Sequence, residues 1–166
     1  SYEMQWGEWL RAELVQGLPL ESSEDPDIAI LLKKVQLHHH VLLGEPPSVY
    51  LPTVTDDLLE RAIGDTYPQI VAHWDEDDDE FNQILALCRM CYTLQYKEIV
   101  PKDVAAQWFI SSLQHDDVDD QSTYALQLMI NAYIGQTEPQ NWTLFHAELA
   151  KLVKVLSQRL DHYFAA

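Results

Sequence analysis

Residues 80–95 read EFNQILALCRMCYTLQ, a strongly apolar stretch of the 166-residue chain. Its apolar side chains recur at three- and four-residue spacing, as Phe81, Ile84, Leu85 and Cys88 illustrate. Such spacing places side chains on one face of an α-helix, and the additional apolar residues between them widen that face. The stretch therefore predicts a helix at the centre of the fold.

Helical spacing also dominates the rest of the chain. Beyond this stretch we expect helices over about residues 6–17, 26–38, 56–74, 120–134 and 142–163, and a short one after Pro101. No stretch alternates convincingly at period two, and only five glycines are present. The sequence therefore predicts an all-α fold, an antiparallel bundle of about six to seven helices in a single domain over residues 1–166.

Three segments refine these expected helices. The nearly all-apolar start of IAILLKKVQL (28–37) predicts a buried helix. The three prolines and the glycine of LLGEPPSVYLP (42–52) predict an extended crossing loop. Pro68 can kink or split the helix expected over residues 56–74, because proline lacks the backbone N–H that an interior helical position donates.

The net charge of the chain narrows the classes of partner. With 27 acidic against 10 basic residues the formal net charge is -17, which repels phosphate backbones and anionic lipid headgroups. We therefore expect no nucleic-acid partner and no membrane partner. Two cysteines, no apolar run near 18 residues and no signal-peptide pattern predict a reduced, cytoplasmic protein.

Six consecutive acids, Asp75 to Glu80, lie between Trp74 and Phe81. Such a run is usually a solvated loop or the first turn of a helix, where the helix dipole favours carboxylates. Acids beside aromatic rings can also bind a cationic, hydroxyl-rich ligand. Two bases in apolar surroundings, Arg89 and Lys102, either form internal ion pairs or reach a phosphate.

Two other motifs have plain structural interpretations. Cys88 and Cys91 form C-x-x-C without a second cysteine pair, which indicates two small core residues on a helix. The histidine triplet at residues 38–40 fans around a helix end instead of converging, so we expect it in solvent and not on a metal. No nucleophile elbow, Walker loop or glycine-rich phosphate cradle is present, and we expect no catalytic residue and no metal ligand in this chain.

Four blocks resemble one known family. In order along the chain, from about Trp6 to Gln136, they are WGEW, DPDIAILLKK, DEFNQILALCRMCYTLQYKEIVPKDVAAQW and AYIGQ. They resemble the C-terminal helical domain of the aminoglycoside (3'')(9) adenylyltransferases, bacterial enzymes of streptomycin and spectinomycin resistance. In that family an N-terminal nucleotidyltransferase domain carries the magnesium ligands and the catalytic carboxylate.

The resemblance implies what the chain does. Together with the abrupt start at SYEMQWGEW, it implies a substrate-binding domain without its N-terminal nucleotidyltransferase domain, inactive alone. The partners it implies are that domain, a cationic aminoglycoside and ATP, with magnesium held by the N-terminal domain. A rival interpretation remains open, in which the chain is an acidic helical module that docks a basic protein and has no enzymatic role.

The resemblance also implies roles for six residues. Those expected to contact the aminoglycoside are Trp9, Asp75, Asp79 and Asn82. Those expected to reach the ATP phosphates are Arg89 and Lys102. Ile70 stands where streptomycin-modifying relatives have a second tryptophan, which leaves open whether the ligand is spectinomycin alone or also streptomycin.

Overall fold

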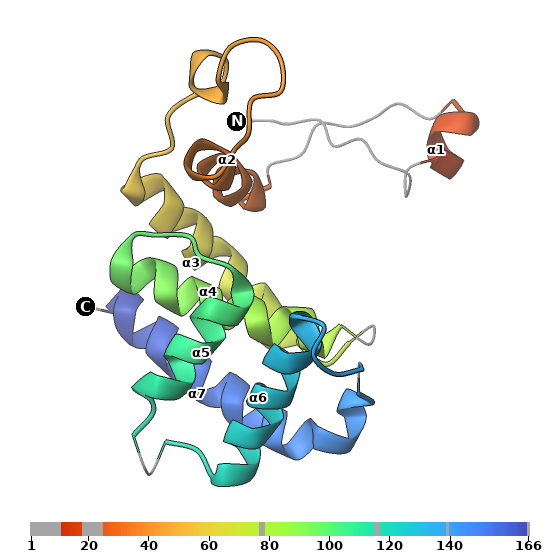
Figure 1. The fold of residues 1–166 in the computed structure, drawn as a ribbon, viewed down its shortest axis with the longest axis vertical. Helices are drawn as coiled ribbons and strands as arrows, with labels where there is room; N and C mark the ends of the chain where they lie inside the picture. The colour runs from red at the N-terminus through yellow and green to blue at the C-terminus, as the bar shows by residue number, and fades with distance from the viewer. Residues whose placement is uncertain (1–10, 18–24, 77–78, 115–116, 139, 166) are drawn as a thin grey trace.

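The fold was taken from a computed structural model that describes residues 11–17, 25–76, 79–114, 117–138 and 140–165. Its α-helices are α1 (Arg11–Val15), α2 (Asp27–Leu37), α3 (Asp56–His73), α4 (Glu80–Tyr96), α5 (Lys102–Ser112), α6 (Asp120–Tyr133) and α7 (His146–Ala165) (Figure 1). Two short 3-10 helices, η2 (Pro47–Val49) and η3 (Trp142–Phe145), lie between them. The described residues contain no strand, and the predicted all-α bundle is confirmed.

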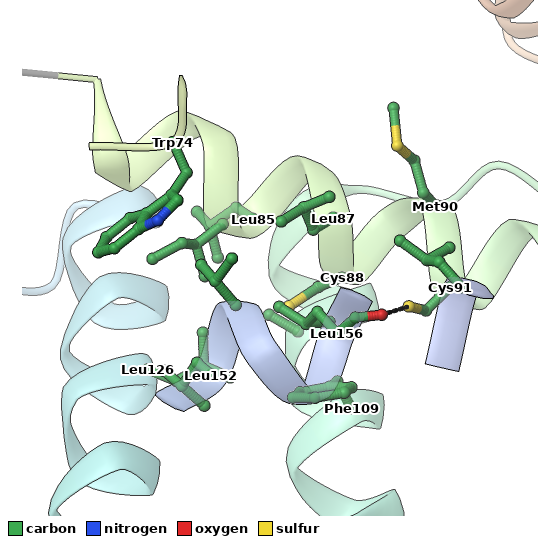
Figure 2. Close-up of a cluster of buried hydrophobic side chains, with 14 of the residues drawn as sticks. Trp74, Leu85, Leu87, Cys88, Met90, Cys91, Phe109, Leu126, Leu152 and Leu156 are labelled. Atoms are coloured by element: carbon green, nitrogen blue, oxygen red, sulfur yellow. Dashed lines mark hydrogen bonds between the residues drawn. The ribbon is translucent and has the colours of Figure 1, made fainter. Parts of the chain in front are cut away.

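The helix α4 lies at the centre of the bundle, as its sequence predicts. Ile84, Leu85, Leu87 and Cys88 are completely buried. Figure 2 shows the side chains that meet α4 from the helices around it, namely Phe109 of α5, Leu126 of α6, and Leu152 and Leu156 of α7. Each fully buried leucine or isoleucine contributes about 1.5–3 kcal/mol to folding, so this cluster holds α4 to α7 together.

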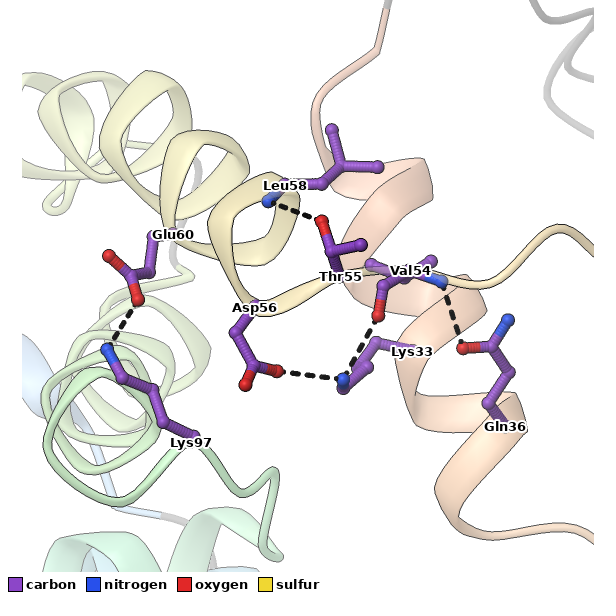
Figure 3. Close-up of polar contacts among 8 residues, drawn as sticks. All are labelled: Lys33, Gln36, Val54, Thr55, Asp56, Leu58, Glu60 and Lys97. Carbon is purple, nitrogen blue, oxygen red and sulfur yellow. Dashed lines mark hydrogen bonds and ion pairs between the residues drawn. The ribbon is translucent and has the colours of Figure 1, made fainter.

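Local signals set the ends of α3 and α4. The backbone N–H of Leu58 donates to Oγ1 of Thr55 at 3.3 Å, which caps the start of α3 (Figure 3). Pro68 lies inside α3, and the helix runs unbroken from Asp56 to His73. The helix α4 ends where Lys97 adopts a left-handed conformation with φ of 59° and donates its backbone N–H to Thr93 at 2.7 Å.

The prediction that residues 28–37 form a buried helix is wrong in its burial. The helix α2 forms, but none of its residues is buried, and Leu31 remains 58% exposed. The apolar pattern fixes the helix but not the number of neighbours around it. In the structure α2 lies at the end of the molecule opposite α6 (Figure 1). Of its apolar side chains, those of Ala29, Ile30 and Leu32 pack, partly buried, against the core.

Polar contacts attach α2 to the chain that leads into α3. The Lys33 ammonium donates to the Val54 carbonyl oxygen at 3.0 Å and pairs with Asp56 at 3.0 Å (Figure 3). The backbone N–H of Val54 donates to Oε1 of Gln36 at 3.2 Å. These contacts fix α2 against the start of α3 without burying it.

The predicted burial of the two cysteines and the predicted exposure of the histidine triplet are confirmed. Cys88 and Cys91 are buried free thiols within the core. His38 to His40 are exposed and follow the last residue of α2. His38 and His39 bond to separate backbone oxygens, those of Ile99 and Val35. Over the described residues no helix is long and apolar enough to cross a membrane.

Candidate functional site

The helices α2, α3 and α4 and the start of α5 enclose a cleft of about 290 Å³. Four of the six residues assigned by resemblance line it: Asp79, Asn82, Arg89 and Lys102. The other lining residues are Asp27, Ile30, Leu31, Ile63, Thr66, Ile70, Gln83, Ala86, Met90, Thr93 and Ile99. Positions far apart in the sequence thus form one site.

The spacing of these residues on α4 explains why they meet. Asp79, Asn82, Ala86, Arg89 and Thr93 follow one another at three- and four-residue intervals, which puts them along one side of the helix. The completely buried residues of α4 occupy the intervening positions and face the core. One helix therefore holds the bundle together on one side and presents polar groups to the cleft on the other.

A hydrogen-bond network joins acidic and basic groups of the cleft. Asp79 accepts from Nδ2 of Asn82 at 2.7 Å and from Nε2 of Gln83 at 2.9 Å. The Lys102 ammonium donates to the backbone and side-chain oxygens of Asn82, each at 3.2 Å. Asn82 thus bridges a carboxylate and an ammonium, and it orders both without neutralising either.

Arg89 and Lys102 lack an acidic partner within the described part of the chain, where no carboxylate lies within 4.0 Å of either group. Burial lowers the pKa of the Arg89 guanidinium. Burial also lowers the pKa of Lys102, and the nearby charges of Arg89 and Lys34 add to that effect while Asp79 opposes it. Clustered, partly desolvated cations without a counter-ion favour the binding of an anion.

The two remaining candidates are Trp9 and Asp75. Trp9 lies outside the described residues. Asp75 is not among the residues that line the cleft. Its carboxylate instead lies 3.0 Å from Nε2 of His146, the first residue of α7, and this hydrogen bond lowers the pKa of Asp75. Ile70, the position noted for its departure from relatives, does line the cleft.

Sequence reasoning missed the wall of the cleft that α2 and α3 supply. The hydroxyl of Thr66, which is 8% exposed, donates to Oδ1 of Asp27 at 3.1 Å, and both residues line the cleft. A threonine on the inward side of α3 was the available signal, since a buried hydroxyl requires a partner.

The fold and the cleft together define an all-α domain with a cleft that holds both acidic and basic side chains. The sequence profile described as "Aminoglycoside adenylyltransferase, C-terminal domain" matches residues 50–159. This chain belongs to that family, which confirms the resemblance found in its sequence.

Individual relatives agree with this assignment. The chain is 33% identical over 159 residues to a spectinomycin 9-adenylyltransferase of Staphylococcus aureus, a match that covers 96% of this chain and 58% of the relative. It is 33% identical over 138 residues to an aminoglycoside (3'')(9) adenylyltransferase of Escherichia coli, covering 82% and 50% respectively. The chain thus spans about half of the length of the relatives that it matches.

A solved structure resembles the fold over nearly the whole chain. It is the spectinomycin adenyltransferase AAD(9) from Enterococcus faecialis, in a crystal structure with ATP and spectinomycin. The TM-score is 0.76 and the sequence identity 26%, and the match covers 96% of this chain and 60% of the other.

Proposed function

We propose that this chain is the helical ligand-binding domain of an aminoglycoside nucleotidyltransferase, which transfers AMP from ATP to a hydroxyl of spectinomycin. The observation that carries this proposal is the cleft. Asp79 lines it together with Arg89 and Lys102, two bases without a carboxylate partner among the described residues. A polycationic drug and a polyanionic nucleotide are a pair of ligands that such a combination of acidic and basic groups suits.

In this proposal Asp79 and Asn82 bind the drug. The Asp79 carboxylate accepts hydrogen bonds from neutral amides alone among the described residues, so its negative charge remains available to a drug ammonium. Asn82 lies beside it with both donor and acceptor atoms for drug hydroxyls. Trp9 would cover a ring face of the drug, as the family resemblance implies.

Arg89 and Lys102 bind the phosphates of the nucleotide. Arg89 presents a planar guanidinium with several N–H donors, and Lys102 presents a compact ammonium, and both groups suit phosphate oxygens. Their mutual repulsion is relieved when a phosphate binds between them. This relief adds to the affinity for ATP in the proposed complex.

The cleft acts in the reaction by positioning. A drug hydroxyl oxygen attacks the α-phosphorus of ATP, the bond from this phosphorus to the bridging oxygen breaks, and pyrophosphate leaves. Holding both ligands in one cleft makes this step effectively unimolecular. Magnesium, which stabilises the phosphate charge when bound, and the base that takes the hydroxyl proton are assigned to an N-terminal nucleotidyltransferase domain.

Three observations favour spectinomycin over streptomycin as the drug. Ile70 gives the cleft an aliphatic surface where a second aromatic ring would be needed for stacking. Asp75 is engaged by His146 outside the cleft. The two proteins named above whose matches cover 96% of this chain are both spectinomycin enzymes.

Calorimetric titration of spectinomycin into the 166-residue chain tests the proposed role of Asp79 in drug binding. We expect Asp79→Asn to weaken binding by about 2–5 kcal/mol, the range for removing one side of a desolvated charge pair. The matched control is Glu76→Gln in the same acidic run, because Glu76 is exposed and bonds to His73. Equal losses in both variants, vanishing at high salt, would mean a diffuse anionic surface and no site at Asp79.

Adenylylation assays test the division of labour between domains. We expect the purified chain to transfer no AMP to spectinomycin or streptomycin, and the chain joined to a nucleotidyltransferase domain of its family to do so. AMP transfer by the 166-residue chain alone would contradict the assignment of the base and the magnesium ligands to another domain.

A further inference from the structure

A second cavity lies on the side of α4 away from the cleft. Its volume is about 530 Å³, which exceeds the 290 Å³ of the cleft, and the two share no lining residue. Helical register separates them, because α4 presents Arg89 and Thr93 to the cleft but Cys91 and Leu94 to this cavity. The helices α5 and α7 supply most of its remaining walls. We call it the α4–α7 cavity.

The floor of the α4–α7 cavity is apolar. Leu94 and Leu160 line it and are buried. The thiol of Cys91 donates to the carbonyl oxygen of Leu156, so its hydrogen is already used (Figure 2). Water against such a floor gives up hydrogen bonds, and its displacement by an apolar molecule is therefore favourable.

Contacts outside the α4–α7 cavity hold its aromatic walls in place. The indole Nε1 of Trp108 donates to the hydroxyl of Tyr96 at 3.1 Å, and the Tyr96 ring packs edge-on against the indole. From α7, the hydroxyl of Tyr163 accepts from the Lys97 ammonium, and the Tyr163 ring packs edge-on against Phe164. Rings fixed in this way keep the space open, and a ligand that binds against them immobilises few side chains.

The rim of the cavity carries polar groups that the fold does not use. Gln95, Gln158 and His162 are exposed lining residues, and their side chains form no hydrogen bond within the described part of the chain. Arg159 differs from them, because its donors are matched by Ser112 and Asp117. An apolar floor with a few unused polar groups, in a volume of roughly 300–1,000 Å³, is the usual composition of a small-molecule site.

The charges of the lining favour a ligand without net charge. Arg159 and Asp117 both line the cavity and pair at 3.2 Å, so they offset each other. A cation would meet the Arg159 guanidinium. An anion would meet the Asp117 carboxylate and the field of a chain with a net charge of -17.

We propose that the α4–α7 cavity is a second binding site, which takes an uncharged, flat aromatic molecule with polar substituents at its edge. The aromatic body lies against Trp108 and Tyr163, and the substituents bond to the amides of Gln95 and Gln158. The proposal does not depend on the function of the cleft. The alternative is a hollow that holds only water.

Fluorine NMR titration of three probes into the 166-residue chain tests the proposal. The probes are a fluorinated indole, which is uncharged, and the same ring carrying the cationic aminoethyl group of tryptamine or the anionic acetate group of indole acetate. We expect saturable binding of the indole. Both charged probes should bind at least about ten-fold more weakly, because each brings an unpaired charge to the cavity.

Tryptophan substitutions at the rim locate the site. Gln95→Trp on α4 and Gln158→Trp on α7 each fill the space from an exposed position, and we expect each to weaken binding of the indole at least about ten-fold. Gln107→Trp adds the same ring to an exposed position of α5 that does not line the cavity, and should leave binding unchanged. Circular dichroism melting curves verify that all three variants fold.

Amide chemical shifts of the chain distinguish the cavity from the cleft. We expect the indole to shift the amide signals of Leu94 and Gln158 and to leave those of Asn82 and Lys102 in place. Shifts confined to Asn82 and Lys102, or indole binding that survives both Gln95→Trp and Gln158→Trp, would overturn the location. Equal affinity for the three probes would overturn the ligand class, and the absence of saturable indole binding would overturn the site itself.

Discussion

Arg89 in the cleft and Arg159 at the far side of α4 are both half-buried arginines, but their surroundings differ. The Arg159 guanidinium donates to Oγ of Ser112 at 2.6 Å, to the Ser112 carbonyl oxygen at 3.1 Å and to Asp117 at 3.2 Å. It also lies 4.8 Å from the ring centre of Phe109. We call this cluster the Arg159 junction. Arg89 has no such partner among the described residues.

The difference between the two arginines separates a structural cation from one available to a ligand. A partly buried guanidinium that serves the fold has its donors matched by oxygens of the protein, since unmatched donors cost free energy. A guanidinium that serves a ligand is left unmatched until the ligand arrives. The predictions below test this division between the Arg159 junction and the cleft, from the largest expected effect to the smallest.

The largest effect concerns the thiols beside the Arg159 junction. Cys91 donates to the carbonyl oxygen of Leu156, and burial raises its pKa to about 12. Alkylation needs a thiolate, so both native cysteines should react with iodoacetamide at pH 8 about a thousand-fold more slowly than an exposed thiol. The control is Asn82→Cys, which places a thiol in the cleft. Rapid alkylation of the native cysteines in the folded chain would show that the junction is open.

The next effect is on stability. Arg159→Met keeps the apolar stem but removes the matched donors, and should lower the free energy of unfolding by about 1.5–3 kcal/mol, the range for hydrogen bonds to a charged group. Arg89→Met removes an unmatched cation and should change it by less than about 1 kcal/mol. Urea unfolding followed by circular dichroism measures both. Equal losses would remove the distinction between the two arginines.

The third effect sharpens the comparison with a second base of the cleft. Lys102→Met should weaken the binding of ATP to the chain about ten-fold, equivalent to one charge-assisted hydrogen bond. Its effect on the free energy of unfolding should be slight, because among the described residues Lys102 bonds only to Asn82. Lys154→Met, which alters an exposed base of α7, is the matched control for net charge. A large drop in melting temperature with normal ATP binding would identify Lys102 as structural.

The smallest effect extends the comparison to carboxylates. The hydrogen bond from His146 lowers the pKa of Asp75 below its ordinary value of 3.8. Its contribution to stability is therefore present above that value and is lost as pH falls through the folded-state pKa. The melting temperatures of wild type and Asp75→Asn should differ slightly at pH 5 to 6, and the difference should vanish in strong acid. A difference that persists there would indicate a packing role.

Much of the fold and part of the site follow from local sequence patterns. The period of the apolar residues in residues 80–95 fixes both the helix and its buried side. The intervals of three, seven and ten residues from Asp79 to Asn82, Ala86 and Arg89 then place these residues on the remaining side. Lys102 joins them because α5 begins directly after Pro101 and packs against α4.

The rest depends on contacts between distant segments, which no local pattern encodes. His146 lies 71 residues from Asp75, so the hydrogen bond between them could not be foreseen. The pairing of Thr66 with Asp27 likewise requires knowing that α2 packs beside α3. The burial of α2 was mispredicted for the same reason, because hydropathy reports what a helix can bury and not what surrounds it.

The attachment of α2 has a consequence for how the cleft responds to a ligand. An element that buries no side chain loses little apolar contact when it separates, so its local opening requires less free energy than that of α4. We therefore expect the α4 side of the cleft to be rigid. The α2 side, which includes Asp27, Ile30 and Leu31, should open locally more easily. Amide hydrogens of α2 should exchange with deuterium faster than those of α4. A ligand that touches both walls slows that exchange, and part of its binding free energy offsets the entropy lost as α2 becomes immobile.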